Sequence, residues 1–322
     1  MSLHIGSSNI SDIYVGNSKI SDIYVGNDLV YTSNKGPDLT VPLYFEPADP
    51  SVAVTVGFRK GSTENTSDPS SIDFSKYTGY SDPAWSYSYD AVTWSNYSIG
   101  NNITIGGSNP SRVYFKSRTN YTAIPWRGRY TDSSSKLAST YYTFLQFTTS
   151  GGNVKGGGNI QSLLYSDFTA YDSVLAFCFY YMFYKCASLT SAPALPATTM
   201  VSGCYWSMFQ GCTSLTSAPE LPATTLESYC YNSMFKNCTA LTSIPKLPAT
   251  TLVNGCYWSM FSSIKANATA SAPCVYPYRI PESGTGGGDT IALNEMFANI
   301  DGTGTFAPTL NTTFYTSVPA MN

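Results

Sequence analysis

The chain has 322 residues, enough for two or three domains, and 11% of them are charged, against about 25% in an average soluble domain. The net charge of −3, with 17 Lys and Arg, argues against nucleic-acid binding, because phosphate recognition needs a concentrated basic patch. No apolar run approaches the roughly 18 residues of a transmembrane helix, so no membrane insertion is expected. The abundance of Ser, Thr, Asn, Gly and Tyr is typical of exposed β structure and extracellular repeat proteins rather than of cytosolic enzymes.

Residues 1–33 contain a short repeat, in which residues 10–17 recur letter for letter as residues 20–27. β-Branched residues alternate with polar ones and end in Gly-Asn, which predicts a strand and a turn, twice. Such hairpins bury little surface within one chain, so three chains wrapped together would complete the core, which predicts a homotrimer. The alternative is a pair of edge strands that pack on the next domain. The apolar positions of the repeat are Ile10, Ile13, Tyr14, Val15, Ile20, Ile23, Tyr24 and Val25.

Residues 34–158 begin with Asn-Lys-Gly-Pro at 34–37, which predicts a hinge, and carry short stretches in which apolar and polar or small residues alternate. These stretches lie at 52–58, 85–89, 113–116 and 142–147, with turn signals between them. Several short strands with turns between them predict a β-sandwich. The expected fold class is therefore mainly β, with short helices only in the following part.

Residues 159–322 are organised around a 26-residue repeat. One series of cysteines keeps this step at Cys178, Cys204, Cys230 and Cys256, and a second series keeps it at Cys186, Cys212 and Cys238. The Leu, Met-Phe and Pro positions of the repeat keep the same step. A unit of this length cannot bury its own apolar face and must stack on its neighbours, so the period predicts a solenoid. The i, i+4, i+8 spacing of Cys204, Met208 and Cys212 predicts a short helix in each unit, and residues 214–219 predict a short strand ended by proline.

The repeat pattern weakens at both ends of this part. Residues 158–165 keep the 26-residue step at Ile160 and Leu163, which predicts a degenerate first repeat that caps the stack. Residues 282–289 are Gly-rich and predict an inserted loop, after which Met296-Phe297 restores the pattern. Residues 301–322 are expected to form a terminal cap.

The eight cysteines have three interpretations. The sequence has no Cys-x-x-Cys pair, and His4 is the single histidine, so a zinc site of the usual spacing is not expected. Disulfides would need an oxidising compartment, whereas the N-terminus has no signal-peptide pattern and predicts no secretion by the usual route. A ladder of buried free thiols explains the strict step with no further assumption.

Catalytic constellations are poorly supported, and no enzyme, cofactor or metal is expected. His4 lies in the N-terminal repeat, so neither large part has a Ser-His or Cys-His pair. The glycine run at 284–288 lacks the Gly-Lys-Ser/Thr ending of a phosphate-binding loop. The carboxylates of residues 34–158 leave a two-carboxylate glycosidase open as an alternative.

One position of the repeat points to a binding face. Two residues after each cysteine of the first series stand Tyr180, Trp206, Asn232 and Trp258, off the Cys-Met stripe. Aromatic side chains on such a face stack on sugar rings or on a partner protein. The alternative is that they pack against a neighbouring subunit or the next repeat.

Three stretches of the sequence resemble known families. The repeat, from about residue 177 to 252, resembles the leucine-rich repeats of the BspA-like class, which implies a solenoid used on bacterial surfaces and, in related phage proteins, on virions. The N-terminal repeat resembles the attachment repeats of fibre proteins in tailed phages of gut Bacteroidales. Residues 87–94, 113–116 and 158–165 resemble the β domain, and the segment leading into the repeats, of Bacteroidales surface and phage proteins.

These resemblances imply a non-enzymatic structural and adhesive virion protein, a head or tail fibre. Residues 1–33 would attach it to a phage capsid or tail protein and hold the trimer together, and the solenoid would face a host-surface glycan or protein. Such a protein is assembled in the host cytoplasm and exposed on the particle surface. The alternative is a BspA-like adhesin of the bacterial cell surface; the N-terminal repeat and the missing signal-peptide pattern favour the virion protein.

Overall fold

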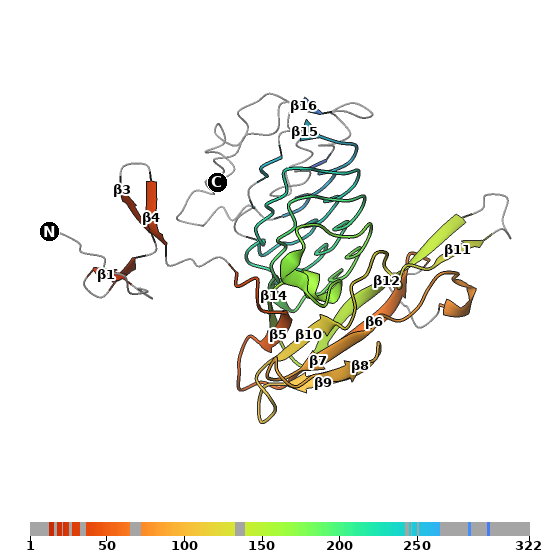
Figure 1. Cartoon of the computed structure of the whole chain (residues 1–322), viewed down its shortest axis with the longest axis horizontal. Helices are drawn as coiled ribbons and strands as arrows, with labels where there is room; N and C mark the ends of the chain where they lie inside the picture. The colour runs from red at the N-terminus through yellow and green to blue at the C-terminus, as the bar shows by residue number, and fades with distance from the viewer. Residues whose placement is uncertain are drawn as a thin grey trace. The chain divides into compact units, whose positions relative to one another are not determined.

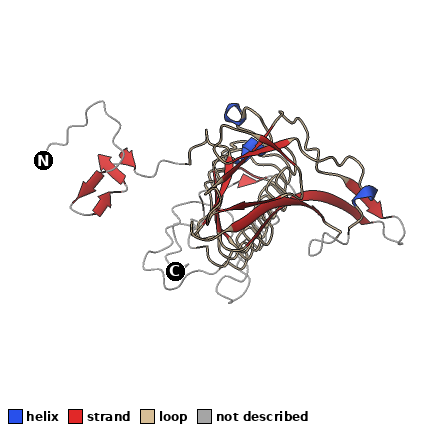
Figure 2. Cartoon of the chain, turned by 90° about the horizontal axis from the view of Figure 1, so that it is seen from below, coloured by secondary structure: helices blue, strands red, loops and turns tan. Residues whose placement is uncertain are grey.

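The computed structural model describes residues 13–15, 18–20, 22–25, 28–32, 37–64, 72–132, 139–241, 245, 247–249, 251–264, 283–284 and 295–296. The chain divides into two compact units, residues 1–38 and 39–322. As expected, the fold is mainly β, and Figure 2 shows strands and loops with only short helices. The helices of the described residues are the 3-10 helices η2 (Phe74–Lys76), η3 (Ile160–Leu163) and η4 (Phe168–Ala170). Within the described residues, no helix is long and apolar enough to cross a membrane.

The N-terminal unit contains two antiparallel hairpins. Strand β1 (Ile13–Val15) pairs with β2 (Ser18–Ile20), and β3 (Asp22–Val25) pairs with β4 (Asp28–Thr32). In both hairpins the two residues between the strands are Gly-Asn, the kind of pair that favours a tight hairpin connection. The predicted strand therefore occurs twice, as β1 in the first copy of the repeat and as β3 in the second, while the Gly-Asn pairs lie outside the described residues.

The second unit begins with a six-stranded sheet in the order β14-β13-β5-β10-β7-β8. Its neighbouring strands run antiparallel except β13 and β14, which run parallel. Figure 1 places this sheet at one end of the repeats, in orange and yellow-green. The strands are β5 (Leu43–Pro47), β7 (Trp85–Ser88), β8 (Ser95–Tyr97), β10 (Val113–Ser117), β13 (Val154–Gly157) and β14 (Leu189–Ser191).

A second sheet has four strands in the order β11-β12-β6-β9, all antiparallel. These are β6 (Val54–Ser62), β9 (Asn102–Ile105), β11 (Arg129–Asp132) and β12 (Ser139–Ser150). The longest pairing joins β6 to β12 and sets Phe58 opposite Phe147. β6 shows the expected alternation, since Val54, Val56 and Phe58 are all buried.

Aromatic side chains fill the space between the two sheets. Phe45 of β5 stacks on Phe147 of β12 with ring centroids 4.0 Å apart, and Phe58 of β6 lies 5.2 Å from Phe115 of β10 and 5.1 Å from Trp85 of β7. These five side chains are at most 2% exposed. Aromatic pairs in such geometries contribute about 0.5–1.5 kcal/mol each beyond the burial of their area, so these contacts hold the sheets face to face.

The 26-residue units stack on one another through a regular ladder of backbone hydrogen bonds. The amide of Phe179 donates to Cys204, that of Tyr205 to Cys230 and that of Tyr231 to Cys256, each at 3.0 Å. The amides of the alternate residues donate within the same repeat, to the carbonyl three residues earlier; that of Trp206, for example, donates to Gly203. Successive backbone amides thus donate in turn to their own repeat and to the next repeat. The buried N–H groups are therefore hydrogen-bonded without a helix or a conventional sheet. Figure 1 shows the turns lying one above another, from green to blue.

The predicted short helix in each unit is wrong. The stretch from Cys204 to Cys212 is a run of turns, and Gly203, Ser207 and Gly211 have positive φ angles of 60°, 53° and 78°. A left-handed residue at every fourth position prevents an α-helix from continuing. The four-residue turn also returns side chains to one face, so its i, i+4, i+8 stripe matches that of a helix. A short strand is predicted after the second cysteine of each repeat. The first repeat forms it as β14, whereas residues 214–219 of the second repeat do not form a strand.

Identical side chains form columns through the interior of the stack. Phe183, Phe209, Phe235 and Phe261 stack in nearly parallel planes with centroids 5.2, 5.6 and 5.7 Å apart. The seven cysteines that the structure describes are all free and buried, which confirms the thiol ladder for them, while Cys274 lies outside the described residues. Repetition of the sequence therefore produces repetition of contacts from one turn to the next.

The parts expected on either side of residue 158 share one core. Phe183 of the first 26-residue repeat lies 5.4 Å from Phe147 of β12, and the Trp126 indole donates to the carbonyl of Cys178 at 3.3 Å. Strand β14, from the first repeat, extends the six-stranded sheet. The repeats thus begin on a rigid platform that the two sheets provide.

Little of the expected C-terminal insertion and cap falls within the described residues. β15 (Thr251–Leu252) pairs in parallel with β16 (Ser283–Gly284), and the amide of Phe261 donates to the carbonyl of Met296 at 2.8 Å. Met296 is fully buried, so it continues the Met position of the repeat as expected. Residues 301–322, the expected cap, lie outside the described residues.

Candidate functional site

The apolar residues expected to attach the protein lie mostly on the two hairpins. Ile13, Tyr14 and Val15 form β1, Ile20 ends β2, and the second copy, Ile23, Tyr24 and Val25, lies on β3. Ile10 lies outside the described residues. The two Ile-Tyr-Val copies thus take equivalent positions, each as the first strand of its hairpin.

The four residues of the expected ligand face are stacked at one position of successive turns, but they differ in exposure. Tyr180 is 9% exposed and Asn232 is 6% exposed, so these two offer little open surface, whereas Trp206 and Trp258 are half-buried. Trp206 packs between two rings, 5.5 Å from Tyr180 and 5.4 Å from Tyr229. These contacts agree with the alternative in which the aromatic residues pack against the next repeat.

A half-buried arginine lies beside this face. The guanidinium carbon of Arg127 is 3.7 Å from the ring centre of Phe177, 4.4 Å from that of Tyr142 and 5.4 Å from that of Tyr180. Burial lowers the pKa of Arg127, and its Nη1 has no hydrogen-bond partner among the residues that the structure describes. The ring faces attract the cation and offset part of this cost. The cluster ties the first repeat to β12, and no sequence signal predicts it because its members come from three separate segments.

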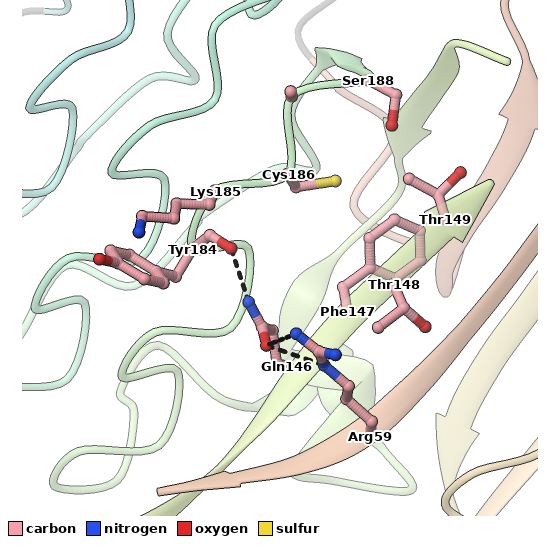
Figure 3. A pocket seen from close by; sticks show the side chains of 10 residues that line it. Arg59, Gln146, Phe147, Thr148, Thr149, Tyr184, Lys185, Cys186 and Ser188 are labelled. Carbon is pink, nitrogen blue, oxygen red and sulfur yellow. Dashed lines mark hydrogen bonds between the residues drawn. The ribbon is translucent and has the colours of Figure 1, made fainter. Parts of the chain in front are cut away.

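An open cleft of about 410 Å³ lies where residues 146–149 of β12 meet the first repeat (Figure 3). The amide of Phe147 in this stretch donates to the carbonyl of Met182 at 2.6 Å, which brings the two segments together. The cleft is lined by Arg59, Gln146, Phe147, Thr148, Thr149, Tyr184, Lys185, Cys186, Ala187 and Ser188. None of these side chains is a carboxylate.

Arg59 is held in the cleft by a chain of hydrogen bonds (Figure 3). It stands opposite Gln146 in the β6–β12 register, and its Nε and Nη2 donate to Gln146 Oε1 at 3.0 and 2.8 Å. Gln146 Nε2 donates in turn to the carbonyl of Tyr184 at 2.7 Å. Gln146 is only 5% exposed, so a neutral amide fixes one edge of the exposed guanidinium, and no carboxylate of the described residues forms an ion pair with it.

Hydroxyl groups and a second cation complete the lining. Thr149 Oγ1 is buried and has no hydrogen-bond partner within the described part of the chain, whereas Thr148 Oγ1 donates to the carbonyl of Gly57 at 3.3 Å. Lys185 is exposed, and burial raises the pKa of Cys186 to about 12, which makes its thiol a poor nucleophile at neutral pH. The cleft therefore suits the binding of negative and hydroxylated groups.

The carboxylates described in the two sheets take part in local structure. Glu46 forms an ion pair with Arg112, and Asp82 with Lys60 at 3.2 Å. Asp90 accepts from the amides of Val92 and Thr93 at 2.8 and 2.7 Å, and these bonds hold the pKa of its carboxyl well below the usual range. The described residues contain no group of three or more side chains placed to hold a metal ion.

Sequence reasoning did not identify the cleft. Arg59, Gln146 and Lys185 lie far apart in the chain, and none belongs to a recognisable motif. Comparison with family models, curated proteins and solved structures gives no match.

Proposed function

We propose that the protein is a non-enzymatic structural and adhesive virion protein, a head or tail fibre of a phage of gut Bacteroidales. Residues 1–33 attach it to a capsid or tail protein and hold a homotrimer together. The two facing sheets form a β-sandwich, and the stacked 26-residue units form a solenoid of the BspA-like leucine-rich-repeat class that is displayed outward.

The observation that carries the proposal is the joining of two kinds of repeat in one chain. Two Ile-Tyr-Val hairpins come first, and each is too small to be stable by itself. They precede a stack of 26-residue repeats that are joined to one another by backbone hydrogen bonds and stacked rings. A small hairpin unit that gains by association suits attachment. A stack that repeats the same contacts suits a stiff, displayed element.

The resemblance of both repeats to phage and bacterial-surface proteins supports the same assignment. The core columns of the described turns are built from Phe, Met and Cys, and the cysteines in them are free. The low proportion of charged residues fits a surface protein better than a cytosolic enzyme.

Two truncations test the proposal with phage particles assembled without the protein. Removal of residues 1–33 should abolish incorporation and leave a folded, soluble second unit. Removal of residues from 160 onward should remove host-surface binding and leave incorporation intact, provided that circular dichroism shows the shortened chain to be folded.

A pair of point variants provides a milder version of the first truncation. Ile13→Asn with Ile23→Asn changes the same position in both copies, and Lys19→Gln on β2 is the matched control. The double variant should incorporate poorly and the control normally. Normal occupancy after removal of residues 1–33 would refute attachment through this segment. Display on a bacterial envelope in the absence of particles would favour the cell-surface adhesin.

A further inference from the structure

We propose that the cleft between β12 and the first repeat binds an acidic saccharide, with Arg59 holding the sugar carboxylate. The biological role of this site rests on the adhesive part of the proposed function. Its chemistry does not, because binding to the isolated chain and incorporation into particles are measured separately.

The charge of the cleft is the first step. Nε and Nη2 of Arg59 are oriented by Gln146, whereas no carboxylate of the described residues forms an ion pair with this guanidinium. Lys185 also lines the cleft, but its Nζ lies over the Tyr184 ring, 5.1 Å from the ring centre, so the charge available to a ligand is that of Arg59. A planar guanidinium with free N–H groups matches the two oxygens of a carboxylate, and because the head is already oriented, less conformational entropy is lost on binding.

The orientation of Arg59 is itself well supported. Gln146 cannot turn its amide over without losing two bonds from Arg59 and one to the carbonyl of Tyr184. Since Tyr184 belongs to the first repeat and Arg59 to β6, the cation is tied to both walls of the cleft. The site is thus built across the junction of the sheets and the repeats.

The uncharged part of the lining identifies a hydroxylated ligand. Thr149 lines the cleft, and its Oγ1 has no hydrogen-bond partner among the described residues. Ser188 adds a further hydroxyl to the lining, and the Thr148 hydroxyl, which donates to the carbonyl of Gly57, keeps its capacity to accept. Sugar hydroxyls both donate and accept, so they match such groups, whereas a peptide carboxylate would satisfy Arg59 and leave the hydroxyls unmatched.

The size of the cleft agrees with this class of ligand. A volume of about 410 Å³ lies in the lower part of the range of roughly 300–1,000 Å³ for small-molecule sites. The opening to solvent would let a longer chain of sugars continue beyond the cleft. We therefore assign the site to one uronic-acid unit of an acidic glycan.

Saturation-transfer NMR on the full chain tests the assignment with sodium D-glucuronate, D-glucose and N-acetyl-aspartate amide. Glucuronate should show saturation transfer that titrates to a dissociation constant. Glucose, which lacks the carboxylate, and N-acetyl-aspartate amide, which lacks the sugar hydroxyls, should each bind at least tenfold more weakly. Absence of transfer to glucuronate overturns the proposal. Equal binding of glucose overturns the role of charge, and equal binding of N-acetyl-aspartate amide overturns the saccharide.

Variants locate the binding within the cleft. Arg59→Gln should weaken glucuronate binding at least tenfold, whereas Arg118→Gln, the same change at an exposed arginine outside the cleft, should leave it unchanged. Thr149→Val keeps the shape and removes the hydroxyl, and should weaken binding at least threefold. If Arg59→Gln fails to fold, Arg59→Lys decides, because it keeps the charge and loses the planar fork, and should weaken binding at least fivefold. Unchanged binding in a folded Arg59 variant overturns the assignment.

Discussion

The ring of Phe177 covers Gly203, which occupies the same position one turn later. A Cβ on Gly203 would lie 2.3 Å from the Phe177 ring, and Gly203 has φ of +60°. The arrangement recurs two turns on, where a Cβ on Gly255 would lie 2.4 Å from the Tyr229 ring. Rings and glycines therefore alternate from turn to turn at a left-handed position, and each glycine provides the room for the ring before it.

Gly203→Ala should lower the free energy of unfolding by about 2–4 kcal/mol. The left-handed backbone accounts for about 1–2 kcal/mol and displacement of the Phe177 ring for the rest. Denaturant unfolding monitored by circular dichroism measures the change. Gly79→Ala is the matched control, because Gly79 also has positive φ but has open space around its Cα, so only the backbone cost applies. An equal loss of unfolding free energy in the two variants would show that the Phe177 ring moves aside at no cost.

The 26-residue period correctly predicted that side chains of one kind would meet turn after turn, because stacked units bring identical positions together. It gave the wrong local structure, because a four-residue turn and an α-helix produce the same stripe over so short a stretch. Ser207, Ser233 and Ser259 adopt positive φ without being glycine, and nothing in their identity indicates it. The cleft was not predicted because it depends on how β12 meets the first repeat, a contact between distant segments.

Trp206→Ala should destabilise the stack by about 2 kcal/mol, because the indole is held between the Tyr180 and Tyr229 rings. Trp206→Phe keeps an aromatic ring in this place and should recover about half of the loss. Thermal or denaturant unfolding of both variants provides the measurement. A neutral effect of Trp206→Ala would mean that the residue is kept for contacts outside the chain, as the binding-face interpretation requires.

The buried thiols predict a loss of stability at alkaline pH. Burial raises the pKa of Cys186, Cys204, Cys238 and Cys256 to about 12 from an ordinary value of 9.0. The unfolded chain releases these protons first, so the stabilisation is complete below about pH 9 and is lost as the pH rises towards 12. Each such thiol should contribute a fall of about 1.4 kcal/mol per pH unit in that window. Urea unfolding between pH 8 and 10.5 measures the slope.

Cys186→Ala separates this effect from tyrosine ionisation. The variant is less stable at every pH because it leaves a cavity, but its slope above pH 9 should be shallower by about 1.4 kcal/mol per pH unit. Thiol counting gives an independent check: in denaturant without reductant close to all eight cysteines should react, and in the native protein the seven described ones should be protected. An unchanged slope, or a count near zero in denaturant, would contradict the ladder of free thiols.

The last prediction concerns the two hairpins of the N-terminal unit. Each pairs only two short strands, and isolated hairpins of this size are marginal in water, so their order should come from association with other chains. Light scattering on the full chain should give about three times 34.9 kDa, and removal of residues 1–33 should reduce the mass to that of one chain without unfolding the second unit. Lys19→Gln, which leaves the apolar residues intact, should keep the trimer. A single-chain mass for the full protein at micromolar concentration would refute the trimer, and a trimer that survives the truncation would place its interface in the second unit.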